Sequence, residues 1–327
     1  MALLAGACMG TGAFLYASNF SKLGINGLAM IGPSGASLCL IIRIFKEIKF
    51  RRATGSWFKE KNSRVLKEDG KIRWSSLVPL IANICTNFGF LLVMSVGWKL
   101  AKASGINQGV IAAMISLASV FNIVIFYFKF GEKISWLHLI GITFMLGCIT
   151  CISLEAAGKG GDEEVDGDEG YVSEDAFGLS QVMAASLAVL CGVTAGVFMS
   201  IKHLFIRLYK ANYSGLDMGV DATMFEFAIC CFFWLPLSST DFRPDLTQVI
   251  IGIIAGCLMS LSRVFISIAV SIGLAAPANS LMTTHSIHQS CWSAAIGGQT
   301  LSPLQILGLI FGLVGVFSIS YFDHLAS

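Results

Sequence analysis

Long apolar stretches alternate with short polar segments along most of the chain, and ten of them are about 20 residues long with few charges. A helix needs about 20 mostly apolar residues to cross a bilayer, because it rises 1.5 Å per residue and the hydrocarbon core is about 30 Å thick. The pattern predicts an all-α, polytopic membrane protein with ten transmembrane helices. The stretches run approximately over residues 2–20, 26–45, 75–98, 106–128, 135–154, 179–204, 219–239, 248–271, 277–297 and 303–322.

Composition supports a lipid-embedded protein rather than a soluble enzyme. The chain is 55% hydrophobic and 13% charged, with a mean hydropathy of +0.75, whereas soluble domains carry about 25% charged residues. All ten cysteines lie in the apolar stretches, where they are expected to be small buried side chains rather than disulfide or metal ligands. No phosphate-cradling loop and no nucleophile arrangement occurs, so we expect neither an enzyme nor a cofactor.

Two polar segments divide the chain. The segment from Arg43 to Arg73 holds eleven of the 22 Lys and Arg residues, so the positive-inside rule places the predicted loop 46–74 in the cytoplasm. Counting ten helices from that loop places both termini there as well. An acidic segment, 155–178, forms a predicted linker on the opposite side. It separates two predicted five-helix units, residues 1–154 and 179–327.

The two units resemble each other in sequence. Residues 131–141 and 298–308 share Gly, Ser, Leu and Gly at a constant offset of 167, and each is a short turn followed by an apolar helix. A G-x-x-x-G pattern, which lets helix backbones approach closely in lipid, also occurs in the first helix of each unit. These patterns are Gly6 with Gly10 and Gly192 with Gly196.

Five is an odd number of crossings, so a second copy of a five-helix unit must insert upside down relative to the first. Inverted-topology repeats are a recurring plan of secondary transporters, in which two similar halves rock around one central site. The sequence therefore predicts a secondary transporter of a small polar organic metabolite that works by alternating access.

A turn before the last helix of the first unit links the chain to a known superfamily. Residues 131–135 read Gly-Glu-Lys-Ile-Ser, which is similar to the Gly-Glu-basic-x-Ser turn of the drug/metabolite transporter superfamily in its EamA-like branch. The second unit keeps Gly298 and Ser302 but has Gln299 in place of the acid. The resemblance implies a small-solute carrier whose path lies between the halves, lined by the third, fourth, eighth and ninth helices.

Polar residues within the apolar stretches are the candidate solute ligands, because such residues are costly in lipid and tend to face a cavity or another helix. The ninth stretch is the most polar, and the offset of 167 aligns Asn122 in the fourth stretch with Gln289 in the ninth. The predicted solute-binding residues are Asn83, Asn87, Ser119, Asn122, Arg263, His285, His288 and Gln289.

Three charged residues, Arg263, Glu226 and Lys202, are predicted to lie within the membrane. Arg263 requires a partner, which is either Glu226 or an anionic solute, and the sequence leaves both open. Glu226 and His285 are candidates for proton coupling. Lys202 is expected to reach the cytoplasmic interface along its aliphatic stem.

A second hypothesis is a non-transporting, transporter-like membrane subunit with a structural or assembly role. In that case the basic segment 43–73 and the acidic segment 155–175 are docking surfaces. For either function the expected partners are membrane lipid and, for a carrier, a small-molecule solute, with no nucleic acid. The sequence leaves open whether the chain forms a homodimer or joins a membrane complex.

Overall fold

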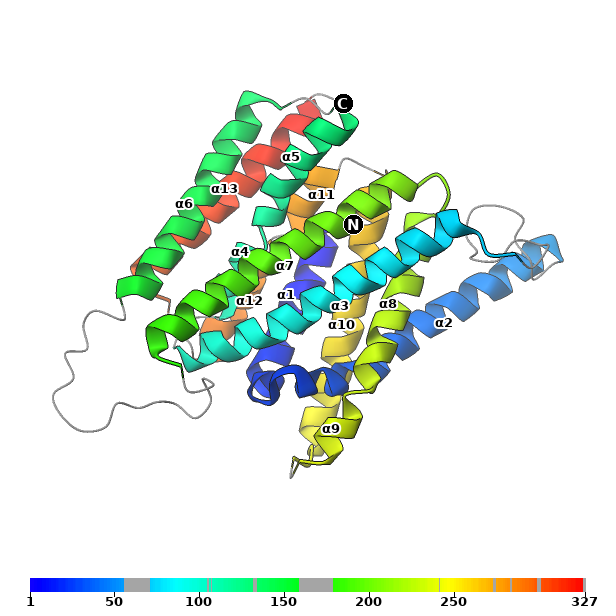
Figure 1. Ribbon diagram of the computed structural model, residues 1–327, viewed down its shortest axis with the longest axis horizontal. Helices are drawn as coiled ribbons and strands as arrows, with labels where there is room; N and C mark the ends of the chain where they lie inside the picture. Colours follow the sequence, from blue (N-terminus) through cyan, green and yellow to red (C-terminus); the bar gives the residue numbers. More distant parts are fainter. Residues whose placement is uncertain are drawn as a thin grey trace.

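The computed structural model shows a bundle of helices (Figure 1). It describes residues 1–55, 71–104, 106, 108–131, 134–158, 179–240, 242–272, 275–282, 284–298 and 301–325. Within these ranges the regular elements are helices, with no β-strand among them. The predicted all-α class is therefore confirmed.

The helices follow the predicted apolar stretches. Those of the first half are α1 (Ala2–Phe20), η1 (Ser21–Gly27), α2 (Leu28–Thr54), α3 (Trp74–Ala103), α4 (Gln108–Met114), α5 (Leu117–Phe130) and α6 (Trp136–Gly158). Those of the second half are α7 (Gln181–Tyr209), α8 (Gly215–Cys231), α9 (Trp234–Ser238), α10 (Leu246–Ile272), α11 (Ala275–Met282), α12 (His285–Ala295) and α13 (Pro303–Leu325). Three predicted stretches consist of two helices each, namely α4 with α5, α8 with α9, and α11 with α12.

Several helices are long and apolar enough to cross a membrane, which is consistent with an integral, multi-pass membrane protein. In the described part of the chain six stretches meet this description: Ala2–Thr54, Trp74–Ala103, Ile111–Phe130, Val182–Tyr209, Gly215–Ser238 and Leu246–Ile272. Two shorter apolar segments, Trp136–Cys148 and Pro303–Ile319, lie on α6 and α13.

The first of these stretches contains two helices, because η1 bends the chain between α1 and α2 (Figure 1). Gly24 has φ +56° and ψ −132°, a conformation that side-chain-bearing residues rarely adopt. Its carbonyl accepts a hydrogen bond from the Tyr16 hydroxyl at 3.2 Å. A glycine in the left-handed region, tied back to the preceding helix, therefore ends α1 and allows α2 to start in a new direction.

The predicted loop 46–74 is partly wrong. Helix α2 continues to Thr54, so Lys46 and Lys49 lie on helix, and Gly55 ends it in the left-handed conformation with φ 73°. The residues before Gly55 include neither glycine nor proline after Gly35, so nothing local stops the helix earlier. Residues 56–70 lie outside the described residues. Of the predicted linker, residues 155–158 belong to α6, and residues 159–178 lie outside the described ranges.

The most extensive helix contacts join one half of the chain to the other. They pair α3 with α7, α1 with α10, α6 with α13, and α2 with α8. Small residues allow the close approach, as where a Cβ on Gly97 of α3 would lie 3.0 Å from Cys191 Cβ on α7. Likewise, a Cβ on Gly315 of α13 would lie 2.8 Å from the Gly141 carbonyl oxygen on α6. The two halves therefore share one packed interior.

The G-x-x-x-G glycines pack against the places where two helices are interrupted. A Cβ on Gly6 of α1 would lie 2.8 Å from the carbonyl oxygen of Met282, the last residue of α11. In the other half, Gly192 and Gly196 of α7 face the junction of α4 and α5, and a Cβ on Gly196 would lie 3.3 Å from Ala118 N. Each unit thus places its first helix against the broken helix of the other unit.

The two turns that carry the sequence repeat also have matching geometry. Gly131 and Gly298 both take positive φ, 67° and 64°, as residues that end a helix in the left-handed conformation do. Four residues after Gly131, Ser135 N–H donates to His138 Nδ1 and His138 N–H donates to Ser135 Oγ, both at 3.2 Å. The equivalent exchange joins Ser302 to a glutamine, at 3.3 and 3.2 Å. These reciprocal caps start α6 and α13.

Gly10→Ala tests the close approach of α1 to the broken helix. The new Cβ would lie 2.5 Å from the His285 carbonyl oxygen and 2.6 Å from His288 Cβ, so a helix must shift. We expect destabilisation of about 1–3 kcal/mol, as for other overpacked interiors. The matched control Gly196→Ala, with its nearest atom at 3.3 Å, should cost clearly less. Thermal unfolding in detergent measures both, and equal melting temperatures would contradict this packing.

Candidate functional site

The interrupted helices bring polar side chains into the interior between the halves. Between α4 and α5, the N–H groups of Ile115 and Ser116 donate three residues back instead of four, so the regular α-helix is interrupted there. The helices α11 and α12 are likewise separate elements. Asn279 Nδ2, on α11, donates to Ser119 Oγ, on α5, at 2.8 Å. This bond joins the broken helix of one half to that of the other. The structure therefore brings the predicted residue Ser119 into a contact between the two repeats.

A second polar contact joins α5 to α7. Asn122 Nδ2 lies 3.1 Å from His203 Nδ1, and both side chains are fully buried. Asn122 Oδ1 and His203 Nε2 have no hydrogen-bond partner among the described residues. The predicted residue Asn122 is thus held by a histidine that the sequence reasoning did not select, and both residues keep one unused polar atom.

The predicted residues of α12 are two histidines that lie within hydrogen-bond distance of backbone carbonyls and a glutamine that does not. His285 Nδ1 lies 3.1 Å from the Met282 carbonyl oxygen, and His288 Nδ1 lies 2.9 Å from that of Thr284. Gln289 is 0% exposed, yet neither its Oε1 nor its Nε2 has a hydrogen-bond partner in the described structure. An unsatisfied buried polar group costs about 1–3 kcal/mol, so an unpaired amide at this position requires an explanation.

The polar stripe of α3 is largely satisfied. Asn83 Nδ2 donates to the Pro79 carbonyl at 2.9 Å and contacts Met218 Sδ at 3.1 Å. Thr86 donates to its own helix, whereas Asn87 Oδ1 is buried without a partner in the described part of the chain. Of the predicted pair Asn83 and Asn87, only Asn87 keeps an unused acceptor.

Arg263 and Glu226 form a buried ion pair. Arg263 Nη1 on α10 lies 3.0 Å from Glu226 Oε1 on α8, and the two side chains are 3% and 0% exposed. The contact is an ion pair rather than an aligned hydrogen bond, because both Glu226 oxygens and Arg263 Nε and Nη2 have no hydrogen-bond partner among the described residues. The sequence left Glu226 and an anionic solute as alternative partners of Arg263, and in the structure Glu226 is the partner. The pair nevertheless leaves guanidinium donors unused.

Lys202 corrects one expectation. The sequence predicts a side chain that reaches the membrane interface, but Lys202 is 1% exposed and its Nζ has no hydrogen-bond partner in the described structure. It lies close enough to Arg263 and Glu226 to interact electrostatically with both. Helix position alone suggested an exit to the interface, whereas packing against the neighbouring helices covers the side chain.

A separate group of charges joins α2 to α8, and we call Arg43, Lys46, Asp217 and Asp221 the α2–α8 charge cluster. Arg43 Nη1 lies 3.0 Å from Asp217 Oδ1 and 3.5 Å from Asp221 Oδ2, and Lys46 Nζ also pairs with Asp217. The Tyr213 hydroxyl donates to Asp221. Burial, together with the neighbouring Asp221 carboxylate, raises the pKa of Tyr213, so the phenol remains a donor.

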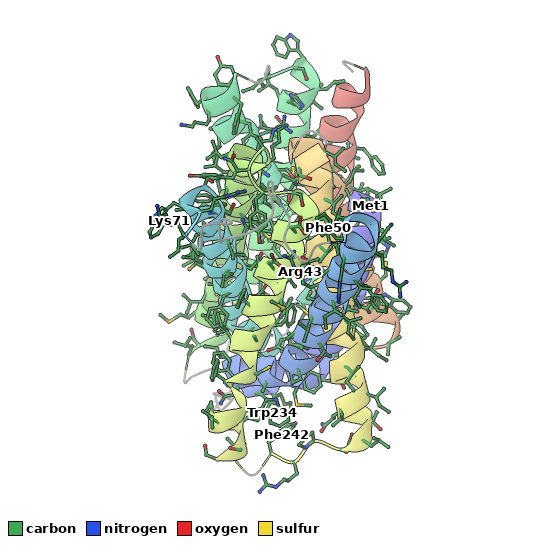
Figure 2. The ribbon with its side chains drawn as sticks, turned by 90° about the vertical axis from the view of Figure 1, so that its right-hand side faces the viewer. Met1, Arg43, Phe50, Lys71, Trp234 and Phe242 are labelled. Carbon is green, nitrogen blue, oxygen red and sulfur yellow. The ribbon has the colours of Figure 1, made fainter. Side chains whose placement is uncertain are left out.

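Figure 2 shows where this cluster lies along the bundle. Arg43 lies near the middle of the view, well above Trp234 and Phe242, which lie together at the lower end. The cluster joins a helix of the first half to a helix of the second, so it ties the two halves together away from that lower end. Sequence reasoning missed it, although Asp217 and Asp221 are spaced to share one face of a helix.

A pocket lies beside the broken helices rather than at the predicted ligands. It contains about 290 Å³ of unfilled space, including the part open to solvent, between the α6–α13 pair and the junctions of α4–α5 and α11–α12. Its polar lining comes from Ser116, Thr284 and Ser286. None of the predicted solute-binding residues lines it, and all except the partly exposed His288 are buried. In this conformation protein covers the predicted ligands.

The chemistry of these groups is binding and charge pairing. Within the described residues no three His, Cys, Asp or Glu side chains gather into a metal-binding group. The buried amides of Gln289, Asn87 and Asn122 offer hydrogen bonds that protein atoms do not use. An amide with an unused polar atom can bind a polar group that reaches it.

Comparisons with known proteins show the fold but no function. No known family model matches the chain, and no curated protein matches it. One solved structure, described only as the crystal structure of a protein, is similar to this chain with a TM-score of 0.65. It shares 14% sequence identity, and the match covers 100% of this chain and 98% of that chain. The whole arrangement of helices therefore also occurs in an experimentally determined structure.

Breaking the Arg263–Glu226 pair should destabilise the protein. Glu226→Gln leaves the buried Arg263 without its acid, and removing one partner of a buried pair costs about 3–5 kcal/mol. The double variant Arg263→Met/Glu226→Gln removes both charges of the pair, so it should lose less than Glu226→Gln alone. Equilibrium unfolding in mild detergent measures the difference, with the exposed Arg52→Met as control. Single and double variants as stable as the wild type would show that the pair contributes no stability.

Proposed function

We propose that this chain is a secondary transporter of a small polar organic metabolite, of the drug/metabolite transporter superfamily and its EamA-like branch. It would cross the membrane ten times as two inverted five-helix units, 1–154 and 179–327, joined by the segment 155–178. Both termini would lie in the cytoplasm, and the two units would rock against each other to expose a central site alternately.

Helix lengths support ten crossings. Beyond the stretches already assigned as candidate spans, α6 and α13 are each 23 residues long, which corresponds to about 34 Å at 1.5 Å per residue and exceeds the hydrocarbon core of about 30 Å. The first candidate stretch provides two crossings, because Gly24 separates α1 from α2. The pair α11–α12 spans 275–295, the counterpart of α4–α5 at 108–130.

The contact pattern supports two equivalent units. Exchanging the units turns the pairing of α3 with α7 into that of α10 with α1, and both pairings are extensive. The same exchange relates α2–α10 to α8–α3, and it maps α6–α13 and α2–α8 onto themselves. The positive-φ glycines and the reciprocal caps also repeat at the offset of 167. Five crossings per unit would make the second unit inverted.

The observation that carries a transport function is the unpaired amide of Gln289. The residue lies on α12, which contacts α1 and α4 of the other half. Both polar atoms of its side chain are buried without a partner in the described structure. A subunit with a purely structural role gains nothing from such a group, whereas a solute that supplies the missing hydrogen bonds explains it.

The α2–α8 charge cluster would help to close one side of the path. Its ion pairs cross from one unit to the other, so separating the units at that end requires breaking them. Arg43 and Lys46 are 20% and 27% exposed, whereas their partner Asp217 is 1% exposed, so separating the units would also have to bring water to Asp217. For proton coupling, His285 Nε2 is buried and unpaired in the described residues, whereas Glu226 is engaged by Arg263.

Gln289→Ala tests the transport function. We expect solute flux into proteoliposomes to fall about tenfold, the loss of one or two hydrogen bonds to the solute, with no loss of folding. Thr143→Ala on the exposed face of α6 is the matched control, because Thr143 bonds only to its own helix. A broad metabolite screen without flux, together with an unchanged Gln289→Ala protein, would instead favour the non-transporting membrane subunit.

The inverted arrangement predicts where the two matching turns lie. An epitope inserted after Gly131 should face the cytoplasm, and one inserted after Gly298 should face the opposite side, because an odd number of crossings separates them. Antibody access in intact and permeabilised cells distinguishes the two sides. Tags at both turns on the same side of the membrane would rule out inversion.

A further inference from the structure

One group of buried charged side chains in the described interior contains two basic residues and one acid. Lys202, Arg263 and Glu226 come from α7, α10 and α8, and all are buried. Arg263 and Glu226 neutralise each other, which leaves the ammonium of Lys202 unmatched. The other acids of the described core, Asp217 and Asp221, are engaged by the α2–α8 charge cluster. A lone ammonium removed from water is costly, so Lys202 loses its proton unless an anion lies beside it.

The unused donors lie on the positive groups. Lys202 Nζ, Arg263 Nε and Arg263 Nη2 have no hydrogen-bond partner among the described residues. One carboxylate acceptor, Glu226 Oε2, is also unused. A lysine ammonium has three donors, and a guanidinium presents a fork that matches a carboxylate. Donors therefore exceed acceptors, and the missing partner is an anionic oxygen group.

The surroundings of Arg263 strengthen such binding. The guanidinium carbon lies 5.4 Å from the centre of the Phe90 ring and 5.8 Å from that of Phe227. Aromatic faces stabilise a cation and exclude water. With water excluded, attraction between the cationic groups and an anion is greater than in solution.

We propose that Lys202 and Arg263 form a subsite for the carboxylate of a singly charged organic anion. This inference rests on the proposed transport function and names its class of solute. A monoanion brings the three side chains and the solute to zero net charge. A phosphate monoester carries about −1.5 to −2 near neutral pH, so it would leave excess negative charge. Glu226 would hold Arg263 in place while the subsite is empty.

Thermal unfolding of the purified protein with defined probes tests the subsite. Lactate, pyruvate and glutamate serve as monoanions, malate and glycerol 3-phosphate as dianions, and glucose as the neutral probe, all at one ionic strength. We expect at least one monoanion to raise the melting temperature more than either dianion does. No shift with any monoanion, or a larger shift with a dianion, would overturn the proposal.

Lys202→Met tests whether the rise in melting temperature with a monoanion comes from binding at this subsite. The variant should weaken monoanion binding by about tenfold to 100-fold, the range for a hydrogen bond to a charged group. Without probe it should be at least as stable as the wild type, because an unmatched buried charge is removed. Lys22→Met, the same change at an exposed lysine, should leave the shift intact. If a monoanion raises the melting temperature of Lys202→Met as much as that of the wild type, Lys202 does not bind the anion.

Glu226→Gln provides an opposite change. It raises the net charge of the group from +1 to +2, so the largest rise in melting temperature should move from the monoanions to malate and glycerol 3-phosphate.

Flux measurements separate this inference from the proposed function. If the wild type and Lys202→Met carry a neutral or cationic solute equally well, the result supports transport and contradicts the anion subsite. If no probe is carried, but a monoanion raises the melting temperature of the wild type and not that of Lys202→Met, the result supports the subsite and contradicts transport.

Discussion

The close approach of α1 and α7 to the two interrupted helices is the constraint on which the interior depends. Where regular α-helical hydrogen bonding is interrupted inside an apolar bundle, the backbone groups that it frees must be covered by protein or water. Gly10 brings α1 against the start of α12, and Gly196 brings α7 against the start of α5. With those backbones covered, Ser119 and Asn279 can meet between the halves. Polar groups therefore occur deep in an otherwise apolar bundle.

The charged residues occupy two places with different physical character. The α2–α8 charge cluster combines two partly exposed cations with two acids that are mostly buried, so its charges are balanced. The inner group has fully buried side chains and an excess of one positive charge. A structural core would be better served by equal numbers of charges or by apolar side chains. The proposed monoanion would remove this imbalance.

The two halves of the chain share their contacts rather than forming separate globules. Each of the most extensive helix pairs takes one member from each half. Relative motion of the units must therefore slide or separate whole helix faces. Gly141 and Gly315 have no side chain that would hold α6 and α13 apart, so the two helices can approach closely. In the proposed transport cycle, the buried candidate ligands and the ion pairs between the halves would correspond to a closed arrangement.

The sequence by itself determined the membrane class, the helix-forming stretches and the repeat, because hydropathy, glycine placement and cap residues act within short segments of the chain. It did not reveal the break at Ser116, since no glycine or proline marks it. It left the partner of Arg263 open and misplaced Lys202. Only the tertiary structure decided these points, as well as the contact between Asn122 and His203. The partner of a buried polar group depends on which distant helices pack beside it, and no local pattern of residues encodes that.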